Sequence, residues 1–371
     1  MILRREPIGQ HPSVFRSMTG LTVEAFDQFL PELRAAFAAD RRRRLDRPGR
    51  RRAGGGGDDF DLSVDDQLLL TVVWLRHYPT QECLGYLFGV SDSTALRAVR
   101  RCLPLLEQSG QDTMRLPDPG KGRRRDLPAL LKETPALAVI VDTFEQRTPR
   151  PQRRQRAYYS GKKKAHTLKS QVAVDEDGRV VDVAESRPGR WADLKVFRRS
   201  GLAGRLIRAQ VGALGDLGYV GLDGVSPRRH AATPRRKPRG QERPPQDRRY
   251  NQAFARRRIV VEHGINRLRR YQALSQVDRH RRKHHTARVR AVAGLGAAPR
   301  RKPRGRPRPA AAGPYNRAFA RRRVVVEHAI GRLRHFRCLA EADRHHRGGH
   351  TERVRAVAGL VNRLLDHANA A

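Results

Sequence analysis

The feature that most constrains this chain is a short apolar run that ends in a carboxylate. Residues 138–141 are Ala, Val, Ile and Val, and Asp142 and Thr143 follow directly. Three β-branched residues in succession predict a buried strand. A buried carboxylate without a partner costs several kcal/mol, so Asp142 must be paired, protonated or bound to metal. We interpret it as the first ligand of a divalent-metal site.

The residues after this strand predict a mixed sheet with flanking helices, which is an α/β fold. Strands are expected over 166–174 and 179–185, joined by the hairpin turn Asp-Glu-Asp-Gly at 175–178. A helix is expected to begin within 191–197. A further strand, 210–214, leads into Gly215 and Asp216, so a second carboxylate also follows an apolar strand.

A third acid lies on a predicted helix, 251–271. Val261, Ile265 and Leu268 form its apolar stripe, and Glu262 sits beside that stripe. The preceding stretch, 227–249, is rich in Arg and Pro and is expected to pack little. Carboxylates without His or Cys ligands favour Mg²⁺ or Mn²⁺. Two such ions roughly 4 Å apart can activate an attacking oxygen and stabilise a leaving oxygen at a phosphodiester.

The C-terminal part contains an internal repeat. Residues 234–295 align with 299–360 at a constant offset of 65, and 40 of the 62 positions are identical. Two copies are too few for a solenoid, so we interpret the repeat as a local duplication of one helical unit. Glu262 is matched by Glu327, and either one can be the third acid.

The N-terminal part predicts helices. Residues 21–39 show helical spacing, and Arg41–Arg44 is expected to begin a basic, flexible linker. Residues 62–108 fit a helix-turn-helix pattern, with Ser63 and Ser91 as helix caps and Gly89 in the turn. The alternative is an ordinary helical bundle. The candidate DNA-contacting residues are on the second helix of the pattern: Ser93, Thr94, Arg97, Arg100 and Arg101.

The charge of the chain points to a polyanionic partner. Its 78 Lys and Arg residues face 37 Asp and Glu residues, which gives a net charge of +41. Nucleic acid is the first candidate, although coding bias towards Arg could explain part of the excess. The three Cys residues have no metal-ligand or disulfide-framework spacing. No apolar run is long enough to span a bilayer, and no signal peptide is recognisable. We expect a soluble, cytoplasmic protein that does not contact membranes.

These patterns divide the chain into five parts, each defined by its range. They are a helical N-terminus with a basic linker, a helix-turn-helix domain, a second linker, an α/β domain and the duplicated copy of the helical unit: 1–61, 62–108, 109–134, 135–295 and 296–371.

The order of the motifs resembles that of the DDE-type transposases of bacterial insertion sequences, in the group that has an N-terminal helix-turn-helix. The resemblance covers about 60–295, and the tail matches again from 299. The motifs that carry it are Val141-Asp142-Thr143, Ser186-Arg187-Pro188-Gly189 with Asp193, Gly215-Asp216-Leu217-Gly218-Tyr219, and Val261-Glu262-His263.

This resemblance implies a ribonuclease-H-like core whose acids bind two Mg²⁺ ions. It implies cleavage of double-stranded DNA at the element's ends by water, then strand transfer to a target by the freed 3′-hydroxyl. Transposases of this kind usually act as multimers, so a homo-oligomer is expected. The competing hypothesis is a decayed, catalytically inactive copy that only binds DNA. A nucleic-acid chaperone acting through its Arg-rich tracts would leave the ordered acids unexplained.

Carried over residue by residue, the resemblance makes Asp142, Asp216 and one Glu the catalytic, metal-binding acids. Glu262 lies 46 residues after Asp216 and Glu327 lies 111 after it. The shorter spacing suits the family, so Glu262 is preferred, although the Glu327 copy alone continues into a terminal helix. Asp193 matches a recurrent Asp, but the residue before it, often His in the family, is Ala192. His166 and Lys169 are candidates for supporting or structural roles.

Overall fold

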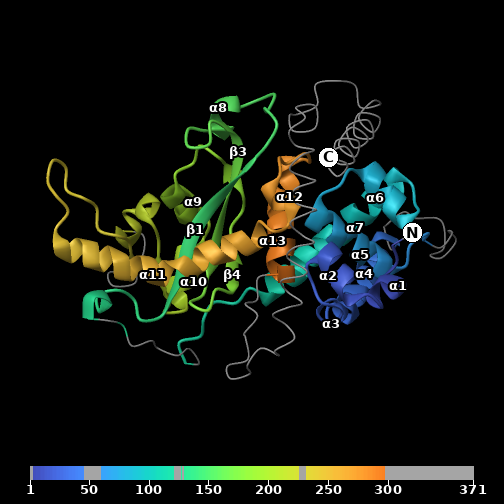
Figure 1. Ribbon diagram of the computed structural model, residues 1–371, viewed down its shortest axis with the longest axis horizontal. Coiled ribbons are helices and arrows are strands. Elements are labelled where there is room, and N and C mark those ends of the chain that lie inside the picture. Colours follow the sequence, from blue (N-terminus) through green and yellow to red (C-terminus); the bar gives the residue numbers. More distant parts are fainter. Residues whose placement is uncertain (1–2, 46–59, 121–126, 128, 225–230, 297–371) are drawn as a thin grey trace, which may run out of the picture. The chain divides into compact units, whose positions relative to one another are not determined.

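The computed structural model describes residues 3–45, 60–120, 127, 129–224 and 231–296 (Figure 1). The predicted flexible linker beyond Leu45 and the duplicated copy of the helical unit, including Glu327, lie outside these described residues.

A mixed sheet forms the centre of the α/β part, as predicted. Strand β1 is antiparallel to β3 and parallel to β6, and β6 is in turn parallel to β7. Along its other edge β3 pairs in succession with the short strands β2, β5 and β4. The strand bounds are β1 Ala138–Arg147, β2 Tyr159–Ser160, β3 Ala165–Val174, β4 Val180–Val183, β5 Arg187–Pro188, β6 Gly212–Leu214 and β7 Ala231–Ala232.

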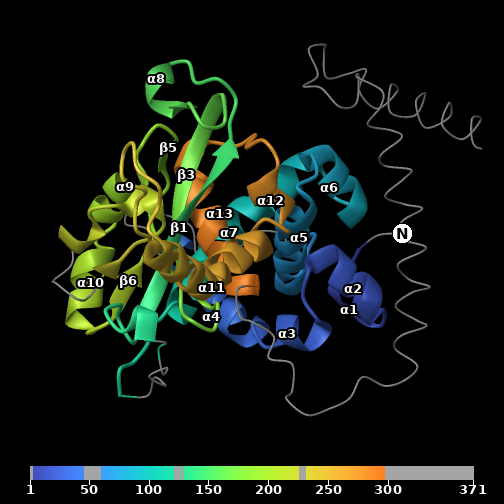
Figure 2. The same cartoon turned by 60° about the vertical axis from the view of Figure 1, so that its left-hand side comes forward.

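Helices cover both faces of this sheet, which is why β1 begins with four buried apolar residues. Ala138 and Ile140 pack in a core with α11 (Pro245–Leu268) and α13 (His285–Gly296). Val139 and Val141 pack in a second core with α9 (Asp193–Arg199) and α10 (Leu202–Arg208). Figure 2 shows the two helix layers on opposite sides of the strands. The predicted buried strand is confirmed.

Helix α11 begins earlier than expected. Pro245 occupies its first turn, where a missing backbone N–H costs nothing. Asp247 lies in the same turn, where its negative charge interacts favourably with the positive end of the helix dipole. Tyr250 and Phe254 extend the predicted apolar stripe towards the N-terminus, and both are buried. None of the described residues of 227–249 is buried, as predicted, but the end of this stretch is helical and Ala231–Ala232 form β7.

The predicted hairpin between β3 and β4 is confirmed, and it anchors α11. The Gly178 N–H donates to the Asp175 carbonyl, and Gly178 has φ +78°, a conformation that favours glycine. Arg257 of α11 donates to Glu176 in the turn, and Arg267 donates to the Gly178 carbonyl. These contacts fix where α11 crosses the sheet.

The helix-turn-helix pattern is formed by α5 (Val64–His77), α6 (Gln81–Phe88) and α7 (Asp92–Thr113). Ser63 and Ser91 cap α5 and α7, each accepting a backbone N–H, and Gly89 ends α6 in the left-handed conformation. Helix α7 continues to Thr113, so the predicted boundary between 108 and 109 falls inside a helix. The reason is that the end of α7 packs on α13 so closely that a Cβ on Gly294 would overlap the Gly110 Cα.

The N-terminal segment is helical, but its helices differ from the prediction. The expected helix over 21–39 is two helices, because Thr22 caps α3 and that helix ends at Asp27. Helix α4 runs to Leu45, so Arg41–Arg44 is helical rather than part of a flexible linker. Asp40 within α4 forms ion pairs with Arg43 and Arg44 at 2.7 and 2.6 Å. The bounds are α1 Arg5–Gly9, α2 Pro12–Thr19, α3 Val23–Asp27 and α4 Leu30–Leu45.

The remaining elements are short. They are α8 Gln155–Tyr158, α12 Gln272–Ser275, and single turns of 3-10 helix at Ala129–Leu131, Leu217–Tyr219, Leu222–Gly224 and Arg282–His284. None of the described helices combines the length and apolar character that crossing a membrane requires.

Candidate active site

Two of the predicted acids follow neighbouring parallel strands at the same level. In the β1–β6 register Ile140 pairs with Leu214, and Asp142 and Asp216 each lie two residues further along. The carboxyl ends of adjacent parallel strands meet at one edge of a sheet, which is where α/β folds place ligands. Strand β6 ends at Leu214, so β1 extends past it, and Asp142, Thr143 and Glu145 in this extension are half-buried.

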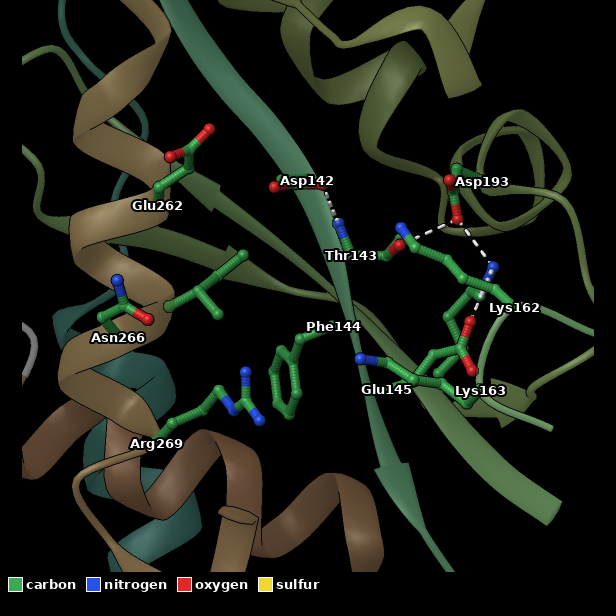
Figure 3. A pocket seen from close by; sticks show the side chains of 12 residues that line it. Asp142, Thr143, Phe144, Glu145, Lys162, Lys163, Asp193, Glu262, Asn266 and Arg269 are labelled. Atoms are coloured by element: carbon green, nitrogen blue, oxygen red, sulfur yellow. Dashed lines mark hydrogen bonds and ion pairs between the residues drawn. The ribbon is translucent and has the colours of Figure 1, made fainter. Parts of the chain in front are cut away.

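Asp142 and Glu262 line one pocket of about 280 Å³. Figure 3 shows Glu262 on α11 facing Asp142 on β1 across the pocket, with Asp193 on the far side of β1. Glu262 is exposed, and its side chain forms no hydrogen bond with the residues that the structure describes. The structure thus brings Glu262 to the same pocket as Asp142, on a separate element.

Asp142 is in an environment that disfavours its charge. Burial raises the pKa of Asp142 to about 6, and the charges of Asp216 and Asp193 add to the shift. Two contacts act in the opposite direction: the Thr143 N–H donates to Asp142 at 2.7 Å, and Arg258 lies 4.0 Å from its carboxylate. Burial is thus the main reason that the charged form of Asp142 is disfavoured, and the neighbouring carboxylates are a smaller one.

Asp193 is held in place by a buried lysine. Lys169 on β3 donates to Asp193 and to the Trp191 carbonyl, at 2.8 and 2.7 Å, and lies 3.6 Å from Glu145. The Thr143 hydroxyl also donates to Asp193 at 2.8 Å. Lys169 and Asp193, both candidates from the sequence, thus form one connected group beside Asp142.

Asp216 begins the loop that follows β6. Its carboxylate accepts the Gly218 N–H at 2.9 Å and caps the turn Leu217–Tyr219. A Cβ on Gly218 would lie 2.6 Å from Asp193 and 3.0 Å from Asp216, so glycine allows the two carboxylates to approach this backbone. Tyr219 is buried beneath the site. Burial raises the pKa of Tyr219, and the charges of Asp142, Asp193 and Asp216 raise it further.

Some site residues were not singled out from the sequence. Asn266 and Arg269 line the pocket with Glu262, and their spacing of four and seven residues from it places them on one face of a helix. That spacing could have identified them. Glu145 lies on the same strand face as Thr143, so strand alternation could have identified it. Lys162 and Lys163 reach the pocket from the loop after β2, which no periodicity predicts.

His166 is not part of this pocket. It lies near the start of β3, opposite Tyr159 of β2, and its ring makes an edge contact with that tyrosine at 5.7 Å between centroids. The supporting and structural roles considered for His166 both stay predictions, and of the two this position is typical of the structural one.

The donor set suits a hard divalent cation, but the acids do not already surround one. Among the described residues, no three His, Cys, Asp or Glu side chains converge closely enough to form a ready-made metal site. The fit rests on other features: the donors are carboxylate oxygens, and the buried Tyr219 hydroxyl has no hydrogen-bond partner in the described part of the chain.

The proposed DNA-contacting face of α7 is only partly as predicted. Ser93, Arg97 and Arg100 are exposed, and Thr94 is half-buried. Arg101 instead turns inwards: its guanidinium donates to Gln67 and stacks 4.3 Å from the ring centre of Phe60. Arg101 therefore packs the helix-turn-helix against α4 and does not belong to the exposed basic face.

Comparison with known proteins agrees with this arrangement. Residues 141–297 match the model of the DDE superfamily endonuclease, and residues 60–112 match the helix-turn-helix of DDE superfamily endonuclease. The chain belongs to the DDE-type transposases of insertion sequences. This transposase is 28% identical over 282 residues to the probable transposase for insertion sequence element IS702 of Microchaete diplosiphon, which covers 76% of this chain and 92% of that protein. No solved structure gives a significant match.

Membership of the family settles the broad chemistry. The transposase is an enzyme with an endonuclease domain and a DNA-binding helix-turn-helix, and the family's chemistry depends on a divalent metal.

Proposed function

We propose that this transposase cuts double-stranded DNA at the ends of its insertion sequence in the pocket at Asp142, and then joins the freed 3′ ends to target DNA. One observation carries this proposal. Asp142 and Asp216 each lie two residues beyond the last paired residues of β1 and β6, at the same level of the sheet, and Glu262 lies across the pocket from Asp142. An antiparallel β1–β3 pair followed by a parallel β6 also supports assigning the core to the ribonuclease-H-like type.

Asp142, Asp216 and Glu262 would hold the metal, which we propose to be two Mg²⁺ or Mn²⁺ ions. Bound ions of this kind supply an activated attacking oxygen and stabilise the leaving oxygen of a phosphodiester. Asp142 is presented from the middle of β1, Asp216 from the loop after β6, and Glu262 from α11, which the Arg257–Glu176 contact fixes to the β3–β4 turn.

The other pocket residues have separate roles in this proposal. Lys162, Lys163 and Arg269 line the pocket and supply positive charge for the phosphates on either side of the cut. Lys169 acts through Asp193: it neutralises that carboxylate and fixes its position beside Thr143. Asp193 is therefore a supporting residue and not one of the three primary acids.

The packing of α11 supports Glu262 over Glu327. A Cβ on Gly264 would lie 2.9 Å from a methyl group of the buried Val174, and the second copy has Ala329 at the matching position. Ala273 is fully buried, and the second copy has Cys338 there. Overpacking of a core typically costs about 1–3 kcal/mol, so the 234–295 copy fits this site better.

The test is nicking of a plasmid that carries the element's ends, with Mg²⁺ or Mn²⁺ and with EDTA as the blank. We expect Asp142→Ala and Glu262→Gln to abolish nicking while leaving binding to an end duplex unchanged. Glu327→Gln is the matched control and should cut like the wild type.

Three results would contradict parts of the proposal. Full nicking by Asp142→Ala would overturn the site. Loss of nicking in Glu327→Gln with activity in Glu262→Gln would move the third acid to the second copy. Binding without nicking by the wild type under either metal would favour the inactive, DNA-binding alternative.

A further inference from the structure

A second cavity, of about 740 Å³, lies between the loop before α13 and the β3–β5 edge of the sheet. We call it the 279–283 groove, after the stretch Arg279–Lys283 that forms one wall. Tyr158 of α8 and Arg187 of β5 line the opposite wall. It is separate from the pocket at Asp142, because the two share none of their lining residues.

The groove is strongly basic. Arg281, Arg282 and Lys283 are exposed, and none of the ion pairs among the described residues involves them. Arg282 lies over the Tyr158 ring, 4.7 Å from its centre. The one acid in the lining, Glu185, is paired with Arg187 at 2.7 Å. Neighbouring cations repel one another unless an anion lies between them.

The loop that carries these cations is rigidly anchored. Asp278, directly before it, forms a buried 2.5 Å ion pair with Arg288 of α13; both side chains are almost fully enclosed. The Tyr78 hydroxyl at the end of α5 donates to Asp278 at 3.2 Å and accepts the Arg279 N–H at 3.1 Å. A flexible, solvated basic arm would not need a buried ion pair at its base. The backbone that carries these cations is therefore fixed in position.

The groove lies beside the helix-turn-helix, because α13, which follows the basic loop, packs on α7 at Gly294 and Gly110, and Tyr78 at the end of α5 binds Arg279. Burial lowers the pKa of His284, and the positive charges of Lys283, Arg288, Arg281 and Arg100 lower it further. Arg100 belongs to the exposed face of α7, so the helix-turn-helix and the loop before α13 contribute to one field. Figure 1 shows α7, α12 and α13 next to one another, and Figure 2 shows β5 near α8.

We propose that the 279–283 groove binds the sugar–phosphate backbone of the DNA duplex whose major groove receives α7. The inference rests on the proposed function, because it assigns a second contact surface to the same DNA. Its chemistry is that of backbone contact: Arg and Lys bind phosphate oxygens, and such contacts position a duplex without reading its sequence. The groove would thus set where the duplex runs as it leaves the helix-turn-helix.

The test is binding of DNA to the triple variant Arg281→Ala, Arg282→Ala, Lys283→Ala in the full chain. Two duplexes of equal length are used, one carrying the element's end and one scrambled, over a series of salt concentrations. Each lost phosphate contact lowers the slope of log affinity against log salt by about 0.9. We expect the slope to fall by about 2–3 and the affinity for both duplexes to fall by at least about tenfold at moderate salt.

The matched control removes the same charge from the opposite helix layer: Arg198→Ala, Arg199→Ala, Arg208→Ala. These arginines are exposed on α9 and α10, and their loss should leave most of the salt slope intact. A conservative variant, Arg281→Lys with Arg282→Lys, should retain most of the affinity. Thermal unfolding of all variants verifies that the exposed substitutions leave the fold unchanged.

The outcomes separate this inference from the proposed function. If the wild type neither binds the end duplex nor nicks the plasmid, the proposed function fails. If the wild type does both and the groove variant retains the wild-type slope or matches the control variant, the groove inference fails. A loss confined to the end duplex would also overturn it, because that result indicates base readout instead of backbone contact.

Discussion

Replacing Asp142 with Asn should stabilise the metal-free protein at neutral pH. The pKa of Asp142 rises from 3.8 to about 6 on folding, mainly through burial. A group whose pKa is raised on folding contributes stability that is fully present below its unfolded pKa and is lost as pH rises through its folded pKa. With 1.36 kcal/mol per pKa unit, the wild type loses about 3 kcal/mol that a neutral asparagine side chain at this position would not lose.

The pH dependence gives the prediction its sharpest form. From the same two pKa values, the free energy of unfolding of the Asp142→Asn variant should exceed that of the wild type by about 1 kcal/mol at pH 4.5 and by about 3 kcal/mol at pH 7.5. The Asn side chain can still accept the Thr143 N–H, so that hydrogen bond is retained. The assay is urea unfolding in EDTA at several pH values. Asp112→Asn, at an exposed acid of α7, is the control and should show no such rise.

A divalent metal should cancel most of the variant's advantage at neutral pH. A ligand at 100 times its dissociation constant stabilises a folded protein by about 2.7 kcal/mol, and Mg²⁺ should give the wild type a gain that the variant lacks. If Asp142→Asn is no more stable than the wild type at pH 7.5 in EDTA, or if its advantage does not shrink towards pH 4.5, the argument that Asp142 is destabilised by its surroundings is wrong.

Two further substitutions test the packing that joins the helix-turn-helix to the α/β part. Asp278→Asn leaves the buried Arg288 charge unpaired, and loss of one partner of such a pair costs about 3–5 kcal/mol; a urea midpoint equal to that of the wild type would refute this. Gly110→Ala places a Cβ 2.5 Å from the Arg290 carbonyl. The clash, which costs about 1–3 kcal/mol, should exceed the gain of about 1 kcal/mol in helix propensity, so the melting temperature should fall. A melting temperature above that of the wild type would show that α7 and α13 can separate freely.

The sequence was most informative where a local pattern and the fold agree. A β-branched run ending in Asp142 is a buried strand, and Asp216 follows a second apolar strand. These two facts placed both acids after apolar segments, and the β1–β6 pairing brings them to the same level of the sheet. Glu262 was singled out beside an apolar helical stripe and preferred for its spacing from Asp216, and it lines the same pocket as Asp142.

The rest depends on contacts between distant residues. The link from Lys169 to Asp193 spans 24 residues and arises from the β3–β1 pairing and the turn at Trp191, so no local pattern encodes it. Arg101 has the helical position expected of a DNA contact, but its guanidinium donates to Gln67 and stacks on the Phe60 ring. The end of α4 was misjudged because four consecutive arginines suggest solvent, whereas Asp40 neutralises two of them within a helix.

The distribution of charge gives a physical reason for the metal dependence. A chain with a net charge of +41 attracts DNA over a long range. The pocket at Asp142 also holds Glu262, and burial, with a smaller contribution from the charges of Asp216 and Asp193, raises the pKa of Asp142 to about 6. Under the proposed function, these acids would repel a phosphate group brought to the pocket. Lys162, Lys163 and Arg269 would offset part of that repulsion, and cations held by the acids would offset the remainder. On this proposal the surface charge recruits DNA, and cations bound in the pocket allow a phosphodiester to approach closely enough to be cut.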